Sequence, residues 1–257
     1  MNNYDYIIIG AGASGILLAD AMGNDTYFNQ KKILLLDKNP KNINDRTWCF
    51  WEKGEGVFDP IVYRKWDNIH FAGRDISKRT DITPYSYKMI RGIDFYNHYL
   101  GRIKKYSNIT FLQGEVVQLK ETNSEVHIHT EGDQYTGKYI FNSIFDYKMA
   151  TRQKKYPVLQ QHFVGWVIKT DLPVFNASEI TYMDFSIPQK GNTRFMYVLP
   201  YSKDTALIEY TLFSEDLLKK EEYESAIKEY ISKRFQCKDY EIIEKETGSI
   251  PMTAYGF

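Results

Sequence analysis

The stretch "YDYIIIGAGASG", residues 4–15, decides the fold. Its apolar run over residues 4–9 is typical of a short buried strand and ends sharply at Gly10. A helical pattern follows in "ASGILLADAM", and a second apolar run of strand length, "KKILLLD", covers residues 31–37. A strand, a glycine turn, a helix and a second strand within about 35 residues form a βαβ unit, whose strands are parallel and whose crossover is right-handed.

The glycines of "GAGASG" follow the G-x-G-x-x-G pattern and stand directly after a strand, where they open a helix. Gly10 allows the tight turn, Gly12 lets the backbone approach a pyrophosphate, and Gly15 lets the helix pack against the strand. We expect the amides around Ala13 and Ser14 to face the phosphates at the positive end of the helix. The pattern predicts a dinucleotide site; a glycine-rich turn without a ligand is the alternative.

Two further positions extend this prediction. Asp37 ends the second strand, where a carboxylate can accept hydrogen bonds from a ribose diol. FAD is favoured over NAD because the unit opens the chain and the next motif is Asp45-Arg46; in many flavoproteins an arginine near that point contacts the cofactor. Arg46 is therefore the candidate for the cation beside the flavin. The alternative is a salt bridge to Asp45 that fixes the loop.

The composition excludes several classes of protein. Hydrophobic residues make up 43% and charged residues 26% of the 257, which is ordinary for a globular protein and argues against disorder. Lys+Arg and Asp+Glu balance at 33 each, so no global field attracts nucleic acid. Cys49 and Cys237 have no metal or redox spacing and suggest a reducing compartment. Without a signal peptide or an apolar run long enough to span a bilayer, we expect a cytoplasmic protein.

The remaining pattern predicts two interleaved domains in an α/β fold (α+β overall). A Rossmann-like FAD/NAD(P)-binding domain takes residues 1–60 and 91–150 plus 246–257, with a helix at 92–105. A β-rich substrate domain takes residues 61–90 and 151–245. In that domain we expect a strand over 61–73 and a charged amphipathic helix over 215–235.

Six motifs, in this order, resemble the lycopene cyclase family of carotenoid biosynthesis: "GAGASG", "DRTWCFW", "QHFVGW", "MYVLPYS", "ALIEYTLFS" and "GSIPMT". They look most like the bacterial lycopene β-cyclases, and the match covers essentially the whole chain. The resemblance implies an FAD-containing fold of the flavoprotein monooxygenase type. It also implies cyclisation of the ψ-ends of lycopene to β-ionone rings, giving β-carotene through γ-carotene, with reduced FAD and no net redox change. NAD(P)H is the implied electron source, and peripheral contact with the inner face of the cytoplasmic membrane is the implied route to the substrate.

Such a cyclisation needs a proton donor, protection of a carbocation from water, and a base. Glu209 in "ALIEYTLFS" is the candidate acid, because a carboxylic acid in an apolar pocket has a raised pKa and stays protonated. Plant and bacterial relatives often carry two successive acidic residues in this strand, whereas here the second position is Tyr210. The alternatives for Glu209 are a role in placing the flavin and an ordinary solvent-facing strand position.

Other aromatic and histidine residues are candidates for substrate or metal binding. Trp48, Phe50 and Trp51 are candidates for the wall of an apolar substrate site, with ordinary core as the alternative. His162 is interpreted as a hydrogen-bonding residue rather than a base. His127 and His129 share a strand face, but the sequence offers no third ligand, so no metal is predicted.

Family members continue past "IPMT" into a glycine-rich segment, and this chain ends there, so we expect it to be a C-terminally truncated sequence. Two alternatives to a cyclase stay open at this point. One is a flavin-dependent monooxygenase or a geranylgeranyl reductase-like oxidoreductase on the same scaffold. The other is an inactive fragment that binds a nucleotide.

Overall fold

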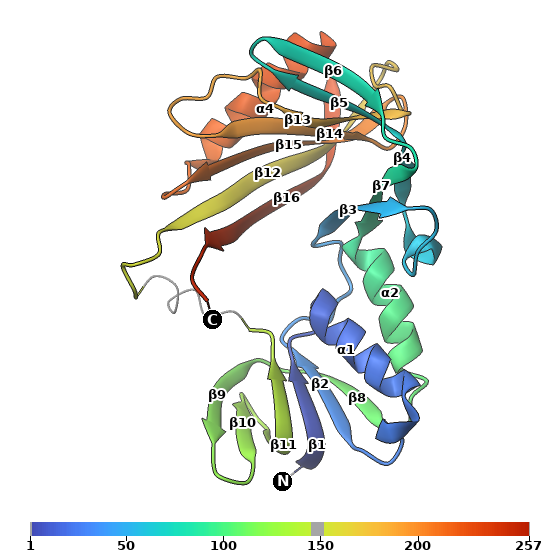
Figure 1. Cartoon of the computed structure of the whole chain (residues 1–257), viewed down its shortest axis with the longest axis vertical. Helices are drawn as coiled ribbons and strands as arrows, with labels where there is room; N and C mark the ends of the chain where they lie inside the picture. Colours follow the sequence, from blue (N-terminus) through green and yellow to red (C-terminus); the bar gives the residue numbers. More distant parts are fainter. Residues whose placement is uncertain (1, 145–151, 257) are drawn as a thin grey trace. The chain divides into compact units, whose positions relative to one another are not determined.

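A computed structural model describes residues 2–144 and 152–256 of the chain (Figure 1). Its contacts form two compact units: residues 2–47 with 91–144, and residues 48–90 with 152–256. These boundaries differ from the sequence prediction. Residues 48–60 and 246–256, expected in the first domain, lie in the second unit. The predicted boundary at residue 150 falls outside the described residues.

The first unit is built on a six-stranded sheet of order β8-β2-β1-β11-β10-β9. The strands β8, β2, β1 and β11 are parallel, and β10 and β9 follow antiparallel. This confirms the predicted βαβ unit. The elements are β1 (Asn2–Ile9), α1 (Ala13–Asn24), η1 (Thr26–Phe28), β2 (Ile33–Asp37), α2 (Gly92–Ile103), β8 (Ile109–Gln113), β9 (Val116–Glu121), β10 (Val126–Thr130) and β11 (Gln134–Asn142).

Both faces of the parallel part of this sheet are covered, as a continuous apolar strand sequence requires. Alternate side chains of β1 and β2, among them Ile7 and Leu34, pack in one cluster with Ile128 of β10. The intervening side chains are equally buried, and Ile8 lies on the side of α1, beside Gly15. The helices α1 and α2 contact each other over this sheet (Figure 1).

The second unit contains a seven-stranded sheet of order β16-β12-β15-β14-β13-β5-β6 and a three-stranded sheet of order β3-β7-β4. Its long strands pair antiparallel, apart from the parallel contact of β13 with β5. The elements are β3 (Thr47–Lys53), η2 (Asp59–Ile61), β4 (Arg64–Trp66), β5 (Asn68–Gly73), β6 (Ile76–Asp81), β7 (Tyr85–Arg91), β12 (Val158–Thr170), β13 (Glu179–Asp184), β14 (Arg194–Pro200), β15 (Thr205–Ser214), α4 (Lys220–Phe235) and β16 (Tyr240–Thr253).

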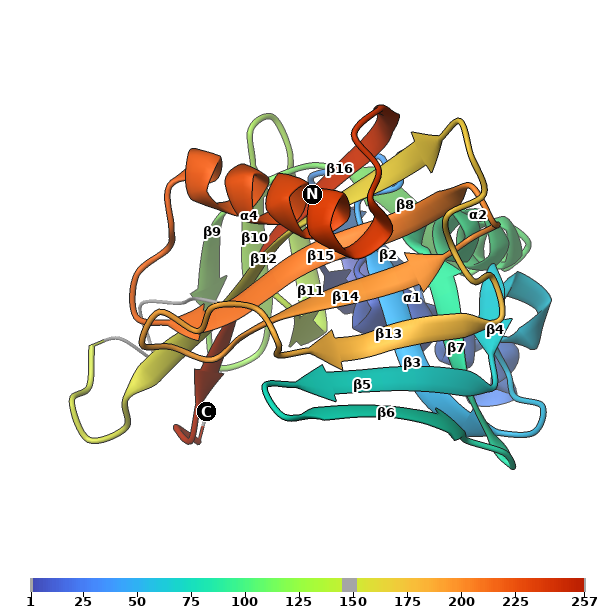
Figure 2. The same cartoon turned by 90° about the horizontal axis from the view of Figure 1, so that it is seen from above.

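The two faces of the seven-stranded sheet have different partners. Helix α4 lies across one face, where Tyr223 and Ile227 pack against Trp166, Ile208 and other buried side chains (Figure 2). The opposite face packs against the three-stranded sheet, through a cluster that includes Leu207 and Tyr87. Each long strand therefore buries alternate side chains in two separate clusters.

Three sequence predictions are corrected in this unit. The expected strand over 61–73 is divided, because β4 pairs with β7 whereas β5 pairs with β13 and β6. The expected helix over 215–235 begins at Lys220, where the Lys219 amide donates to the Glu222 carboxylate (3.3 Å). Residues 246–253 belong to β16, which pairs with β12 from Thr253 to Tyr240 and is therefore part of the second unit.

A substitution at Gly15 tests the close approach of α1 to β1. A Cβ atom at this position would lie 1.9 Å from the Gly10 carbonyl oxygen, which is backbone and cannot rotate away. We expect Gly15→Ala to destabilise the protein by about 1–3 kcal/mol, as overpacked sites do. Gly101→Ala is the matched control, because Gly101 lies in α2 with open space around it and should gain up to about 1 kcal/mol of helix stability. Equal melting temperatures for the two variants would contradict this packing.

Candidate functional site

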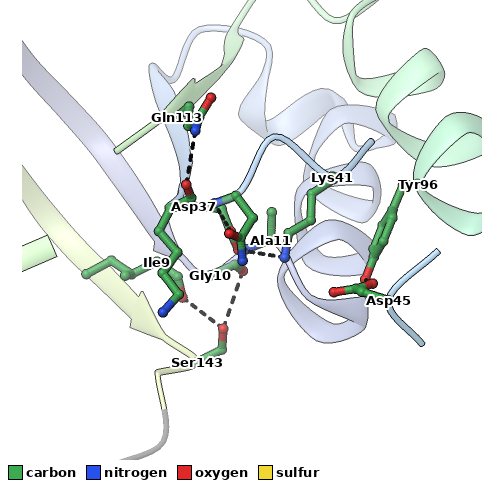
Figure 3. Close-up of polar contacts among 11 residues, drawn as sticks. Ile9, Gly10, Ala11, Asp37, Lys41, Asp45, Tyr96, Gln113 and Ser143 are labelled. Atoms are coloured by element: carbon green, nitrogen blue, oxygen red, sulfur yellow. Dashed lines mark hydrogen bonds and ion pairs between the residues drawn. The ribbon is translucent and has the colours of Figure 1, made fainter. Parts of the chain in front are cut away.

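The glycine turn between β1 and α1 has a geometry at Gly10 that only glycine satisfies. Gly10 has φ +97°, and a Cβ atom there would lie 2.2 Å from the Ser143 hydroxyl. Ser143 donates from this hydroxyl to the Ile9 carbonyl (2.8 Å), which joins the turn to the end of β11 (Figure 3). Gly12, by contrast, has nothing within 4 Å of its Cβ position. The backbone is open there, as the approach of a pyrophosphate requires.

Helix α1 starts directly after this open position. Its first helical hydrogen bond runs from the Ile16 amide to the Gly12 carbonyl (3.0 Å), so the amides of Ala13 and Ser14 lie in the first turn. Gly12 is the N-cap and has no side chain that could cap these amides. The positive end of the helix is therefore suited to an anion. The predicted phosphate contacts of Ala13 and Ser14 stay predictions.

Asp37 ends β2 beside the turn, at the predicted place. One carboxylate oxygen accepts from the Ala11 amide (2.7 Å) and the other from the Asn39 amide (2.7 Å). The Lys41 ammonium lies 3.2 Å from the carboxylate (Figure 3). A carboxylate has about four acceptor positions, so three contacts leave room for one more. The carboxylate holds the turn in place and can still accept one bond from a ribose.

A cavity of about 330 Å³ lies beside these groups. It is lined by the turn, the end of β2 and the loop that follows, the start of β9, and the residues after β11: Ile9, Gly10, Gly12, Leu36, Asp37, Lys38, Asn39, Lys41, Gly114, Glu115, Val116, Ser143 and Ile144. An open backbone at Gly12, a helix N-terminus and a carboxylate at the strand end fit the ADP part of FAD.

Lys41 and Ser143 line this cavity and were not predicted from the sequence. Lys41 has a positive φ of 58° and lies 5.5 Å from the centre of the Tyr96 ring, as well as beside Asp37. Ser143 comes from the end of β11, which pairs parallel with β1. The pairing of these two strands would have indicated Ser143, but no local signal indicates Lys41.

The predicted flavin-side residues Asp45 and Arg46 contact the start of α2. The Asp45 carboxylate accepts from the Tyr96 hydroxyl (2.8 Å), and the Arg46 carbonyl accepts from the Gly92 amide (2.7 Å). The Arg46 guanidinium is exposed and donates to the Asp45 carbonyl (2.7 Å), so the alternative of a salt bridge between them is not what fixes the loop. The role of Arg46 toward a flavin stays a prediction.

The structure does not place Trp48, Phe50 and Trp51 on one surface. They lie on β3, where successive side chains point to opposite faces. Phe50 packs edge-on against Phe58, with ring centres 5.8 Å apart, and Trp48 shares its side of the strand. Trp51 points the other way and contacts Tyr87, with ring centres 5.1 Å apart. A single wall of all three residues is thus excluded by the alternation of the strand.

Glu209 lies on β15, on the face of the seven-stranded sheet turned away from α4. Its register partners are Tyr197 on β14 and Gly165 on β12, and directly opposite residues share a face. Gly165 is also opposite Glu246 on β16. We call this surface, defined by Tyr197, Glu209 and Glu246, the carboxyl face.

Aromatic and thiol side chains gather around the carboxyl face. The ring of Tyr197 lies 5.8 Å from that of Tyr182, which in turn contacts Tyr87 (5.5 Å) and Trp51 (5.2 Å). Burial raises the pKa of the Cys49 thiol to about 12, and the same cause raises the pKa of Tyr197. These side chains are neutral at ordinary pH, so the carboxyl face is lined by uncharged aromatic groups.

Burial raises the pKa of Glu209 to about 8, and the charge of nearby Glu246 adds to the rise. The Thr211 hydroxyl donates to the Glu209 carboxylate (2.5 Å) and opposes the rise only in part. A carboxyl group that stays protonated near neutral pH can act as a general acid. Glu209 therefore has the property that the proposed acid needs.

His162 has the hydrogen-bonding role that the sequence suggested. His162 is buried, and its ring nitrogens contact the Ser214 hydroxyl (2.7 Å) and the Tyr223 hydroxyl (2.6 Å). Within residues 2–144 and 152–256, no three His, Cys, Asp or Glu side chains are placed to hold a metal ion. In the same ranges no helix is both long and apolar enough to cross a bilayer.

Solved structures of flavin enzymes share this fold. A geranylgeranyl bacteriochlorophyll reductase-like protein of Thermoplasma acidophilum has a TM-score of 0.68 at 11% identity, covering 97% of this chain and 66% of its own. The p-nitrophenol 4-monooxygenase PnpA of Pseudomonas putida DLL-E4 has a TM-score of 0.67 at 11% identity, and the match covers 98% of this chain and 69% of PnpA. The flavin-dependent brominase Bmp2 has a TM-score of 0.65 at 16% identity, and the match covers 98% of this chain and 68% of Bmp2. The class is thus an α/β flavoprotein fold shared with monooxygenases and reductases.

Within that class the chain belongs to the lycopene cyclase protein family, which it matches over residues 5–257. It is 22% identical over 260 residues to the lycopene beta-cyclase of Pseudescherichia vulneris. The alignment covers 98% of this chain and 62% of that relative, so the chain spans less than two thirds of the relative's length.

The protonation of Glu209 predicts a specific dependence of stability on pH. In the unfolded chain a glutamate has a pKa of about 4.3, whereas the folded-state pKa of Glu209 is about 8. The folded state therefore binds more protons between these values, and stability is lost as the pH rises from about 4 to about 8. We expect Glu209→Gln to melt at a higher temperature than the wild type at about pH 8, with the difference closing toward about pH 4.

Calorimetry of both proteins across this range measures the effect. Glu215→Gln is the matched control, because Glu215 follows the same strand at an exposed position. A difference in melting temperature between Glu209→Gln and the wild type that does not change with pH would contradict the raised pKa.

Proposed function

We propose that the complete protein is a lycopene β-cyclase that uses Glu209 as its general acid. The observation that carries this proposal is a carboxyl group with a raised pKa on a sheet face surrounded by neutral aromatic side chains. Membership of the lycopene cyclase family supports the substrate class. The product would be β-carotene, formed through γ-carotene.

The reaction balances without net oxidation or reduction. The Glu209 carboxyl gives its proton to the terminal alkene of a ψ-end, a carbon–carbon bond closes the ring, and a base removes a different proton to leave the ring double bond. Tyrosine rings such as those of Tyr197 and Tyr182 stabilise the intermediate cation through their faces, by about 0.5–2 kcal/mol each. Water would trap this cation, so the apolar surroundings of Glu209 matter as much as its acidity.

FAD is the proposed cofactor of the first unit. The turn at Gly12, the first turn of α1 and Asp37 would hold its ADP part, and the flavin would be needed in reduced form, as the family resemblance implies. NAD(P)H is the proposed electron source. Because lycopene is apolar and dissolves in lipid, we also propose that the protein contacts the inner face of the cytoplasmic membrane.

A flavin-dependent reductase or monooxygenase is the second candidate, favoured by the fold that the chain shares with proteins of those names. Such an enzyme would consume NAD(P)H in proportion to its product. A cyclase would need the reduced flavin without consuming it in each turnover.

Expression of the complete gene in bacteria that accumulate lycopene separates these functions. We expect β-carotene in extracts of cells with the wild-type gene, detected by chromatography. Glu209→Gln should lower the yield by about 10²- to 10⁴-fold, because the proton donor is lost. Glu215→Gln should leave the yield unchanged. Persistent lycopene with the wild-type gene would refute the cyclase, and a normal yield from Glu209→Gln would remove it as the acid.

The ribose role of Asp37 is tested by the affinity for FAD. Asp37→Asn keeps an acceptor oxygen for the Ala11 amide but loses the charge, and we expect FAD to bind about tenfold more weakly. The quenching of FAD fluorescence on titration with protein measures this. Asp5→Asn is the control, since Asp5 accepts a backbone amide bond from Lys32 (2.9 Å) away from the cavity. Equal FAD affinity of Asp37→Asn and wild type would exclude the ribose contact.

A further inference from the structure

Two carboxyl groups on the carboxyl face lie on either side of one glycine. Gly165 of β12 is directly opposite Glu209 on one neighbouring strand and directly opposite Glu246 on the other. Residues opposite each other on antiparallel strands point to the same face. The two glutamates therefore project from the same side of the sheet, with only a glycine between them.

Gly165 provides the space in which the carboxyl groups meet. A Cβ atom at this position would lie 2.9 Å from Cγ and 3.1 Å from Oε1 of Glu246, so this side chain extends across the glycine toward β15. Its carboxyl group is near enough to that of Glu209 to raise the pKa of Glu209. Two neighbouring carboxyl groups can share a hydrogen bond only when at least one of them carries a proton.

The groups around this pair favour a single shared proton. Burial and the charge of Glu246 both raise the pKa of Glu209, because two negative charges in contact are strongly disfavoured. Among the described residues, Cys49 of β3, Tyr197 of β14 and Tyr201 after β14 interact electrostatically with one or both glutamates. Tyr87 of β7, Tyr182 of β13 and Glu244 of β16 interact in turn with these three side chains. Burial raises the pKa of Cys49, Tyr197 and Tyr201, so these three side chains are neutral over the working range of pH and the two carboxyl groups titrate as one unit.

We propose that Glu209 and Glu246 are the acid and the base of one catalytic pair, in which Glu209 gives a proton to the polyene and Glu246 takes the proton that the ring releases. This proposal rests on the proposed cyclase function. It assigns to Glu246, which the sequence did not indicate, the base that the reaction needs.

One turnover returns the pair to its starting state. The O–H bond of Glu209 breaks as a C–H bond forms at the terminal alkene, and the next π bond closes the ring. A C–H bond beside the resulting cation then breaks, its electron pair forms the ring double bond, and its proton goes to the Glu246 carboxylate. That proton passes along the hydrogen bond to Glu209. No oxidant or reductant is consumed.

The pH profile of the reaction tests this arrangement. The complete protein, with FAD reduced by dithionite and lycopene in phosphatidylcholine vesicles, is assayed from about pH 5 to about pH 9. The wild type should show a bell-shaped profile, since the rate needs Glu209 protonated and Glu246 ionised. Glu246→Gln should lower the rate by about 10²-fold and also move the alkaline limb to lower pH, because the charge that repels the Glu209 carboxylate is gone.

A merely structural role of Glu246 would lower the rate and leave the alkaline limb in place, and that result would overturn the proposal. Glu241→Gln is the matched control: it makes the same change at an exposed position of the same strand and should keep both rate and profile. If Glu246→Gln does not fold, Glu246→Asp serves instead. It keeps a carboxyl group with a shorter reach and should give a slower reaction with a bell-shaped profile. A loss of the acid limb in Glu246→Asp would contradict the assignment.

Infrared titration of the carboxyl bands gives a readout without turnover. In the wild type the protonated band of Glu209, identified by its loss in Glu209→Gln, should persist above neutral pH, and in Glu246→Gln it should disappear at lower pH. An unchanged titration in Glu246→Gln would show that the two groups do not share a proton. Failure of the wild-type gene to make β-carotene would refute the cyclase separately, since the infrared result does not depend on it.

Discussion

The contact between the start of α1 and the end of β1 is the constraint on which the first unit depends. Gly15 places the helix so near the strand that the Gly10 carbonyl oxygen occupies the space of a side chain. This closeness forces the intervening turn to bend sharply at Gly10, which has a positive φ. The bend in turn directs the Ala11 amide to the carboxylate of Asp37. One packing contact thus sets the turn, the helix terminus and the carboxylate beside a single cavity.

In the second unit the corresponding constraint is the central position of β12. It pairs with β15 on one side and with β16 on the other, so its side chains have neighbours from both strands on each face of the sheet. Trp166 points to α4 and fills the apolar cluster there. Its neighbour Gly165 leaves the opposite face open for two carboxyl groups. A strand with a large residue and a glycine in succession can support a packed core on one side and a reactive group on the other.

The sequence predicted the features that depend on neighbouring residues. The βαβ unit, the glycine turn and the position of Asp37 at a strand end follow from spacing within the first 37 residues, and the structure has them. The features that it missed depend on pairing between distant segments. Glu246 meets Glu209 only because β16 pairs along β12, and the expected assignment of residues 246–257 to the first domain hid that contact.

The prediction that the aromatic motif forms one wall of a substrate site was wrong for a different reason. "TWCFW" is family-specific, but a strand alternates its side chains, so the tryptophans at 48 and 51 point to opposite sides. Trp51 lies three positions after Trp48, and an odd spacing on a strand places two side chains on opposite faces. Residues that are close in the sequence suggest one site, but on a strand only every second side chain can face the same ligand.

The shared fold leaves the chemistry undetermined, because reductases, monooxygenases and a halogenating enzyme have the same architecture. Redox reactions on this fold depend on what the flavin does. Cyclisation depends instead on where a proton is held, and that is a property of side chains on the sheet. A solvated strand glutamate is ionised at neutral pH and cannot donate. The carboxyl group of Glu209 retains its proton because it is partly buried and lies against a second carboxyl group. In the proposed pair, the close contact of two carboxyl groups, which costs stability in most proteins, would keep on Glu209 the proton that the reaction needs.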